Sequence, residues 1–191
     1  MYFSSFLCGV ASSSLSGMGK VGVIAREEYK DAASGFIKGI EEVSPGTEID
    51  IFYISSDTEN DVVSAISDTI YKCGAGIIFT LIGEKYPVVL EKAKEWGKYI
   101  IVGDTYLSSD ESLLLSVDID YAKAISLIIE KTKDEKENTS CIPLGLGDGV
   151  VNLSWFIDEN EINRLDENMK KKAVGIKSTL RRYINDTNGP Q

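Results

Sequence analysis

The chain has 191 residues, of which 43% are hydrophobic and 26% are charged, as in an ordinary globular protein of one domain or of one domain with an appendage. Its formal net charge of −10 disfavours general binding to nucleic-acid phosphates or to anionic lipid. The chain contains no histidine, which excludes Ser-His-Asp catalysis, Cys-His catalysis and histidine-ligated zinc. We expect neither an enzyme nor a bound cofactor.

The first eight residues resemble a short secretory or lipoprotein signal only superficially. They contain no basic residue, and Ser4, Ser5 and Gly9 interrupt the apolar stretch. Leu7 stands before Cys8, where lipoprotein processing requires a small residue. The apolar side chains recur at helical spacing instead, so we expect an amphipathic helix, no export signal, and a cytoplasmic protein if the chain is complete as written.

The three cysteines, Cys8, Cys73 and Cys141, are widely spaced and odd in number. This pattern fits neither a disulfide framework nor a metal knuckle. Because unpaired cysteines are among the most buried residues in proteins, we expect three buried thiols and no bound metal.

Short β-rich segments alternate with helical segments as far as residue 117. The strands are continuous apolar runs, as in a parallel sheet that helices cover on both faces. This repetition with short links predicts an α/β fold with a doubly wound parallel sheet and right-handed crossovers. The predicted strands are 21–25, 49–54, 76–80, 99–102 and 113–117, and the predicted helices are 31–43, a segment capped by 55–57 that runs to Cys73, and 87–96.

The remainder of the chain has a different pattern. We expect a helix over 121–130 with one isoleucine-rich face, followed by a charged turn over 131–138. Further along, the sequence predicts short strands at 141–146 and 150–155, a polar helix or helix pair over 159–185, and a frayed tail over 186–191.

Ligands of open α/β sheets bind at the carboxyl ends of the strands, where the strand order reverses. This rule selects Arg26 after the first strand, Thr80 and Gly83 at the third, and Asp104 and Tyr106 after the fourth. We therefore expect the ligand-binding residues at this edge of the sheet.

Three of these residues have a functional and a plainer interpretation. The Asp104 carboxylate is suited to accept two hydrogen bonds from ribose or sugar hydroxyls, or it is a turn residue. Tyr106 either stacks on a planar ring or covers the sheet edge. Arg26 either neutralises a ligand anion or forms a surface pair with Glu27 or Glu84.

Several segments, in order and spacing, resemble the basic membrane protein family, the PnrA-like purine-nucleoside-binding lipoproteins of ABC transporters. The matching segments are FLCGVA at 6–11, GKVGVI at 19–24, ASGFIKG at 33–39, CGAGIIF at 73–79, EKAKEWGKYII at 91–101 and LGLGDGVV at 144–151. The family's proteins are two-lobed type I periplasmic binding proteins that enclose the ligand between the lobes. The resemblance covers only the later part of the family and implies a second lobe over 1–117, returning first-lobe elements and C-terminal helices over 118–185, and a missing first lobe and signal.

The resemblance also implies which site residues are shared. The family motif "GVDSDQ" corresponds to 102–107, so Asp104 is retained and Tyr106 replaces the second acid. The glycine-rich loop "HAAGGTG" corresponds to 80–86 and retains Gly83. The family's glycine pair after the first strand is replaced by Ala25 and Arg26, and the lysine of "TSMVK" falls near Ile119.

The expected function is that of a truncated solute-binding component of an ABC transporter, with a small-molecule ligand of the nucleoside class and a permease as partner. By resemblance, the family is periplasmic and membrane-anchored through a lipoprotein modification. The alternative is a degenerate remnant or interaction protein that no longer binds nucleoside. In that case the apolar segments left without a first lobe form a homodimer or bind a partner, through Ile125, Ile128, Ile129, Ile142, Leu144 and Leu146.

Overall fold

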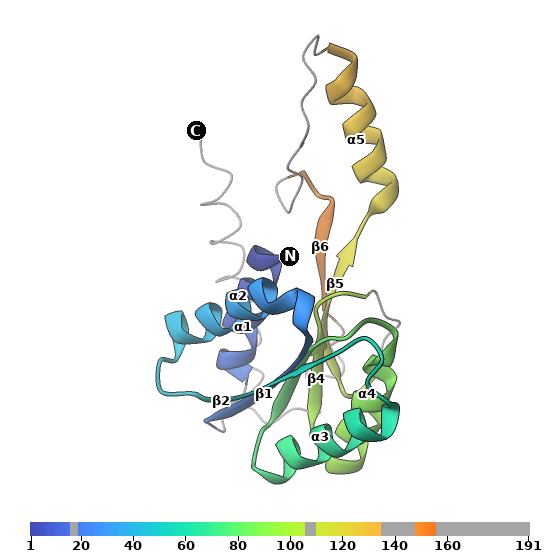
Figure 1. Cartoon of the computed structure of the whole chain (residues 1–191). Helices are drawn as coiled ribbons and strands as arrows, with labels where there is room; N and C mark the ends of the chain where they lie inside the picture. Colours follow the sequence, from blue (N-terminus) through green and yellow to red (C-terminus); the bar gives the residue numbers. More distant parts are fainter. Residues whose placement is uncertain (16–18, 106–109, 135–147, 156–191) are drawn as a thin grey trace.

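A single six-stranded sheet organises the chain, in the strand order β2-β1-β3-β4-β5-β6 (Figure 1). The computed structural model describes residues 1–15, 19–105, 110–134 and 148–155. The first five strands are parallel, and β6 runs antiparallel to β5. The parallel sheet expected from the apolar runs is therefore confirmed. The strands are β1 (Lys20–Arg26), β2 (Glu48–Ile54), β3 (Ile77–Leu81), β4 (Tyr99–Val102), β5 (Leu113–Ile119) and β6 (Val151–Trp155).

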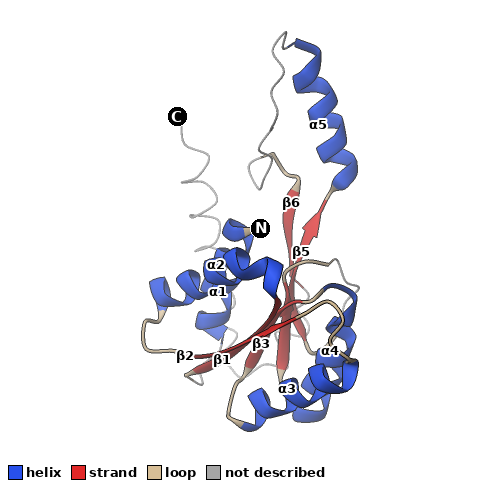
Figure 2. Ribbon diagram, in the orientation of Figure 1, coloured by secondary structure: helices blue, strands red, loops and turns tan. Residues whose placement is uncertain are grey.

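Helices cover both faces of the sheet, which confirms the doubly wound arrangement (Figure 2). Helices α1 and α2 lie on one face, where Phe36 stacks on Phe79 with ring centroids 4.1 Å apart. Helices α3 and α4 lie on the other face and bury a second cluster that includes Ile78 and Ile100. The helices are α1 (Tyr2–Leu15), α2 (Lys30–Val43), α3 (Asn60–Lys72), α4 (Tyr86–Trp96) and α5 (Tyr121–Asp134), with short 3₁₀ turns η1 (Glu27–Tyr29) and η2 (Gly83–Lys85).

The amphipathic helix expected at the amino terminus is α1, and it packs closely against α2. A Cβ placed on Gly39 would lie 2.0 Å from the carbonyl oxygen of Phe6, and one on Gly9 would lie 2.0 Å from that of Phe36. The two helices therefore touch backbone to backbone, which only residues without a side chain permit. This contact fixes α1 on the sheet.

Two expectations about local structure are wrong. Helix α3 begins at Asn60 rather than directly after residue 57. Ser55 and Thr58 close a turn of their own, in which the Ser55 N–H donates to Thr58 Oγ1 at 3.1 Å. The segment 55–57 therefore forms a loop and does not cap the helix. In addition, residues 131–134, expected in a charged turn, continue helix α5.

The cysteines do not share one environment. Cys8 belongs to α1 and is buried in the core, and burial raises the pKa of its thiol. Cys73 is exposed, because it follows the last residue of α3 at the surface, so its expected burial is wrong. Cys141 lies outside the described residues.

The helix and strand expected after residue 118 are confirmed as α5 and β6. Strand β5 runs beyond the end of β4 and forms a two-stranded ribbon with β6, in which Val117 pairs with Leu153 and Ile119 with Val151. Helix α5 follows β5 in the chain and projects away from the sheet (Figure 1). Among the described residues, no helix is long and apolar enough to cross a membrane. The predicted strand 141–146, the helices over 159–185 and the tail over 186–191 lie outside those residues.

Candidate functional site

The structure brings three of the predicted site residues together at the carboxyl edge of the sheet. Arg26 is the last residue of β1, Gly83 opens η2 just after β3, and Asp104 lies two residues after β4. Arg26 and Asp104 both form hydrogen bonds with the peptide group that joins Ile82 to Gly83. We refer to Arg26, Asp104 and this peptide group as the carboxyl-edge cluster.

The Ile82–Gly83 peptide group is held from both ends. Arg26 Nη2 donates a hydrogen bond to the Ile82 carbonyl oxygen at 3.3 Å, and the Gly83 N–H donates to Asp104 Oδ2 at 2.6 Å. The C=O and N–H of a trans peptide point in opposite directions, and the described chain contains no cis peptide bond. Arg26 and Asp104 therefore lie on opposite sides of one peptide group.

Gly83 is the residue that this geometry requires. Its φ of +59° lies in the left-handed region, which side chains other than glycine rarely adopt. A Cβ at this position would also lie 2.9 Å from Arg26 Nη2. Gly83 thus allows both the tight turn and the approach of the guanidinium.

Asp104 is a largely buried carboxylate with an unused acceptor. Its Oδ1 is shielded from solvent and has no hydrogen-bond partner in the part of the chain that the structure describes. Burial raises the pKa of Asp104, while the Gly83 N–H, the Arg26 charge and the Thr105 hydroxyl act in the opposite direction and lower it. A buried acceptor without a hydrogen bond lowers the stability of a protein by about 1–3 kcal/mol. A hydroxyl group that donates to Oδ1 would therefore be stabilising.

The partner of Arg26 differs from both expected acids. Its Nη1 lies 3.6 Å from Glu28 Oε1, whereas Glu27 pairs with Lys30 at 3.3 Å. Surface pairing with Glu27 or Glu84 is thus replaced by pairing with Glu28. The run Arg26-Glu27-Glu28 carries this signal in the sequence, but only the 3₁₀ turn η1 decides which acid faces the guanidinium.

Thr80 has a buried side chain that belongs to the sheet. Its hydroxyl donates to the Ile101 carbonyl oxygen at 3.4 Å, and its own carbonyl accepts from the Gly103 N–H at 2.9 Å. Both bonds tie β3 to the start of the turn that carries Asp104. Contact between Thr80 and a ligand stays a prediction, and Tyr106 lies outside the described residues.

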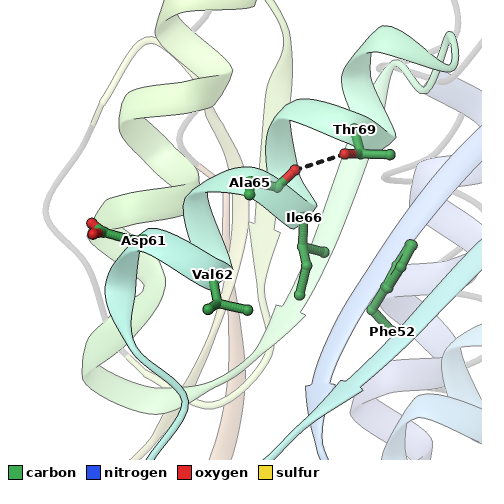
Figure 3. A pocket seen from close by; sticks show the side chains of 6 residues that line it. All are labelled: Phe52, Asp61, Val62, Ala65, Ile66 and Thr69. Carbon is green, nitrogen blue, oxygen red and sulfur yellow. Dashed lines mark hydrogen bonds between the residues drawn. The ribbon is translucent and has the colours of Figure 1, made fainter.

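An apolar hollow of about 370 Å³ lies elsewhere, between the edge strand β2 and helix α3 (Figure 3). None of the predicted site residues lines it. Its one hydroxyl, that of Thr69, donates to the Ala65 carbonyl at 2.8 Å, which leaves Asp61 as the remaining polar side chain. The described residues also contain no group of three or more His, Cys, Asp or Glu placed to hold a metal ion. The lining residues are Phe52, Asp61, Val62, Ala65, Ile66 and Thr69.

Comparison with known proteins decides the family. A family model described as "ABC transporter substrate-binding protein PnrA-like" matches residues 1–187. The chain belongs to the PnrA-like family. The resemblance inferred from the sequence is therefore confirmed, and the carboxyl-edge cluster is part of an ABC transporter substrate-binding protein fold.

Two curated relatives carry the name Basic membrane protein B. The one from Borreliella afzelii (strain PKo) is 28% identical over 180 residues, which cover 89% of this chain and 53% of the relative. The one from Borrelia garinii subsp. bavariensis is 30% identical over 160 residues, covering 78% of this chain and 47% of the relative. This PnrA-like chain thus spans about half the length of the curated relatives it matches.

Solved structures share the fold of this PnrA-like chain. A transcriptional activator of the comK gene from Bacillus halodurans matches with a TM-score of 0.76 and 19% identity, covering 100% of this chain and 65% of that one. An ABC transporter solute-binding protein from Conexibacter woesei matches with a TM-score of 0.70 and 12% identity, covering 100% and 63%. At these identities the likeness establishes the fold alone.

Proposed function

We propose that this chain is one lobe of the solute-binding component of an ABC transporter and binds a small molecule of the nucleoside class at the carboxyl-edge cluster. The observation that carries this proposal is the shielded Oδ1 of Asp104, which has no hydrogen-bond partner among the described residues and lies at the sheet edge where such folds bind ligands. Ribose hydroxyls supply the donors that this oxygen lacks. Arg26, Gly83, Thr80 and Tyr106 complete the proposed ligand-binding set.

The proposed mechanism needs a second wall. Small ligands are commonly held with about 70–90% of their surface buried, and a single sheet edge covers one side only. The chain spans about half the length of its curated relatives, and we propose that a first lobe supplies the facing wall. We therefore expect the lobe alone to bind the ligand weakly. Tight binding requires closure of this lobe against a first lobe.

Membership of the PnrA-like family also supports a permease as the partner of this chain. Solute-binding proteins deliver their ligand to the permease of an ABC transporter, and we propose that role here. The family is typically extracytoplasmic and lipid-anchored. This favours an extracytoplasmic site of action over the cytoplasmic one expected from the first eight residues.

Isothermal titration calorimetry with inosine and guanosine tests the proposal. We expect weak one-site binding that is lost in Asp104→Asn and kept in Asp61→Asn, a matched charge change in the apolar hollow beside α3. Tight binding by the lobe alone would contradict the requirement for a second wall. Equal binding by both variants would show that Asp104 does not contact the ligand.

One observation favours a second candidate function, an interaction protein. The side chains of Tyr121, Ile125 and Ile129 on α5 are 69%, 58% and 50% exposed. Contiguous apolar surface of this kind is typical of a partner site. We propose that a homodimer partner or a separate first lobe covers it.

Sedimentation equilibrium separates this candidate from a simple binding lobe. We expect self-association that a paired change, Ile125→Ser with Ile129→Ser, abolishes. Val62→Ser is the control, because Val62 is 48% exposed but lies on α3. A monomer at all concentrations, with amides of α5 strongly protected from hydrogen exchange, would refute the interaction.

A further inference from the structure

We infer that the carboxyl-edge cluster binds a hydroxylated small molecule that also carries a negatively charged group, with Arg26 as the anion-binding residue and Glu28 as the carboxylate that the ligand's anion displaces. This inference rests on the proposed function and narrows its ligand class. A nucleoside monophosphate and a sugar phosphate are two sources of the same chemistry.

The Arg26 guanidinium is incompletely satisfied by the protein. Nη2 reaches the Ile82 carbonyl at 3.3 Å, Nη1 lies 3.6 Å from Glu28, and Nε is shielded from solvent without a hydrogen-bond partner among the described residues. Guanidinium presents five N–H donors in a planar fork that matches carboxylate and phosphate groups. One long ion pair and one carbonyl leave most of this capacity unused.

Glu28 is placed as an easily exchanged partner. Its side chain is 56% exposed, whereas that of Arg26 is 20% exposed. Exposed ion pairs stabilise proteins only slightly, so returning the Glu28 carboxylate to water has a small unfavourable effect. A ligand anion that makes two short hydrogen bonds to the less exposed guanidinium would gain more than the Glu28 pair provides.

The opposite ends of the cluster define the rest of the ligand. Arg26 and Asp104 bind opposite ends of the Ile82–Gly83 peptide group, so one ligand that reaches both needs an anionic group at one end and a hydroxyl at the other. A neutral nucleoside would donate a hydrogen bond to Asp104, but it would not replace Glu28 as the ion-pair partner of Arg26.

Titration calorimetry on the whole chain with matched ligand pairs tests this inference. The pairs are inosine with inosine 5′-monophosphate and ribose with ribose 5-phosphate, which differ by one phosphate each. A charge-assisted hydrogen bond is worth about 1.5–3 kcal/mol, so we expect the phosphorylated member to bind about tenfold tighter or more. Arg26→Ala should abolish this difference, and comparing the two pairs identifies the source.

Glu28→Gln gives the sharper variant, since it changes a side chain that is more than half exposed. It should strengthen binding of the phosphorylated members and leave the neutral members unchanged. Glu27→Gln is the matched control, because Glu27 lies in the same turn but pairs with Lys30. An equal gain in both variants would show an effect of overall charge and overturn the displacement step.

The remaining outcomes separate this inference from the proposed function. Equal binding of neutral and phosphorylated members, with loss in Asp104→Asn, overturns the inference and leaves the proposed function intact. Binding of inorganic phosphate as tight as that of ribose 5-phosphate overturns recognition of the hydroxyl. No binding of any member contradicts both.

Discussion

Replacing Gly83 with alanine tests the geometry of the carboxyl-edge cluster directly. A non-glycine residue at a φ of +59° costs about 1–2 kcal/mol. The new Cβ would also lie 2.9 Å from Arg26 Nη2, so the guanidinium must withdraw from the Ile82 carbonyl. Loss of that hydrogen bond adds about 1 kcal/mol. We therefore expect the free energy of unfolding to fall by about 2–3 kcal/mol.

Gly97 supplies a closely matched control. It ends α4 with the same φ of +59°, and a Cβ placed there meets nothing within 4 Å. Gly97→Ala should therefore cost only the backbone component, about 1–2 kcal/mol. Urea unfolding followed by circular dichroism measures both values, and we expect Gly83→Ala to cost about 1 kcal/mol more.

The difference between the two variants should depend on Arg26. In an Arg26→Ala background, Gly83→Ala and Gly97→Ala should destabilise the protein equally. If the two variants already cost the same in the parent protein, or if the difference persists without Arg26, the proposed steric contact does not exist. Ligand binding gives a second measurement, because only the Gly83 change should weaken it.

Three further predictions concern the core and the site. Gly39→Ala should cost about 2 kcal/mol or more in urea unfolding, because α1 must shift from a 2.0 Å contact, whereas Gly46→Ala, which meets nothing within 4 Å, should cost little. A thiol reagent should modify Cys73 rapidly and Cys8 only on unfolding, and equal rates would contradict the burial of Cys8. Because burial raises the folded pKa of Asp104, the protonated carboxyl group favours the folded state. This stabilisation is fully present below the ordinary pKa of 3.8 and is lost as the pH rises through the folded pKa. The parent protein should therefore lose stability relative to Asp104→Asn over that window in pH-dependent urea unfolding, and a constant difference would refute it.

Local pattern was sufficient to predict the sheet. Runs such as 21–25 and 99–102 are apolar throughout because helices cover both faces, so strand type and direction follow from composition. The edge on which Arg26 and Asp104 lie follows in turn from the direction of parallel strands. These features depend on neighbouring residues and on general rules of topology.

The finer features depend on the exact ends of helices and turns, and on contacts between residues that are distant in the sequence. The choice of Glu28 over Glu27 as partner of Arg26 depends on the turn η1, and both acids look alike in the sequence. The exposure of Cys73 depends on where α3 ends. The unused oxygen of Asp104 is visible only once the Gly83 N–H has taken its other oxygen.

A single amide links the two sides of the carboxyl-edge cluster electronically. A cation at the Ile82 oxygen draws electron density toward that oxygen, which makes the Gly83 N–H a stronger donor to Asp104. Whatever neutralises Arg26 therefore weakens the support for the Asp104 carboxylate, and the reverse also holds. Binding of a ligand at one end of this amide should therefore change the strength of binding at the other end.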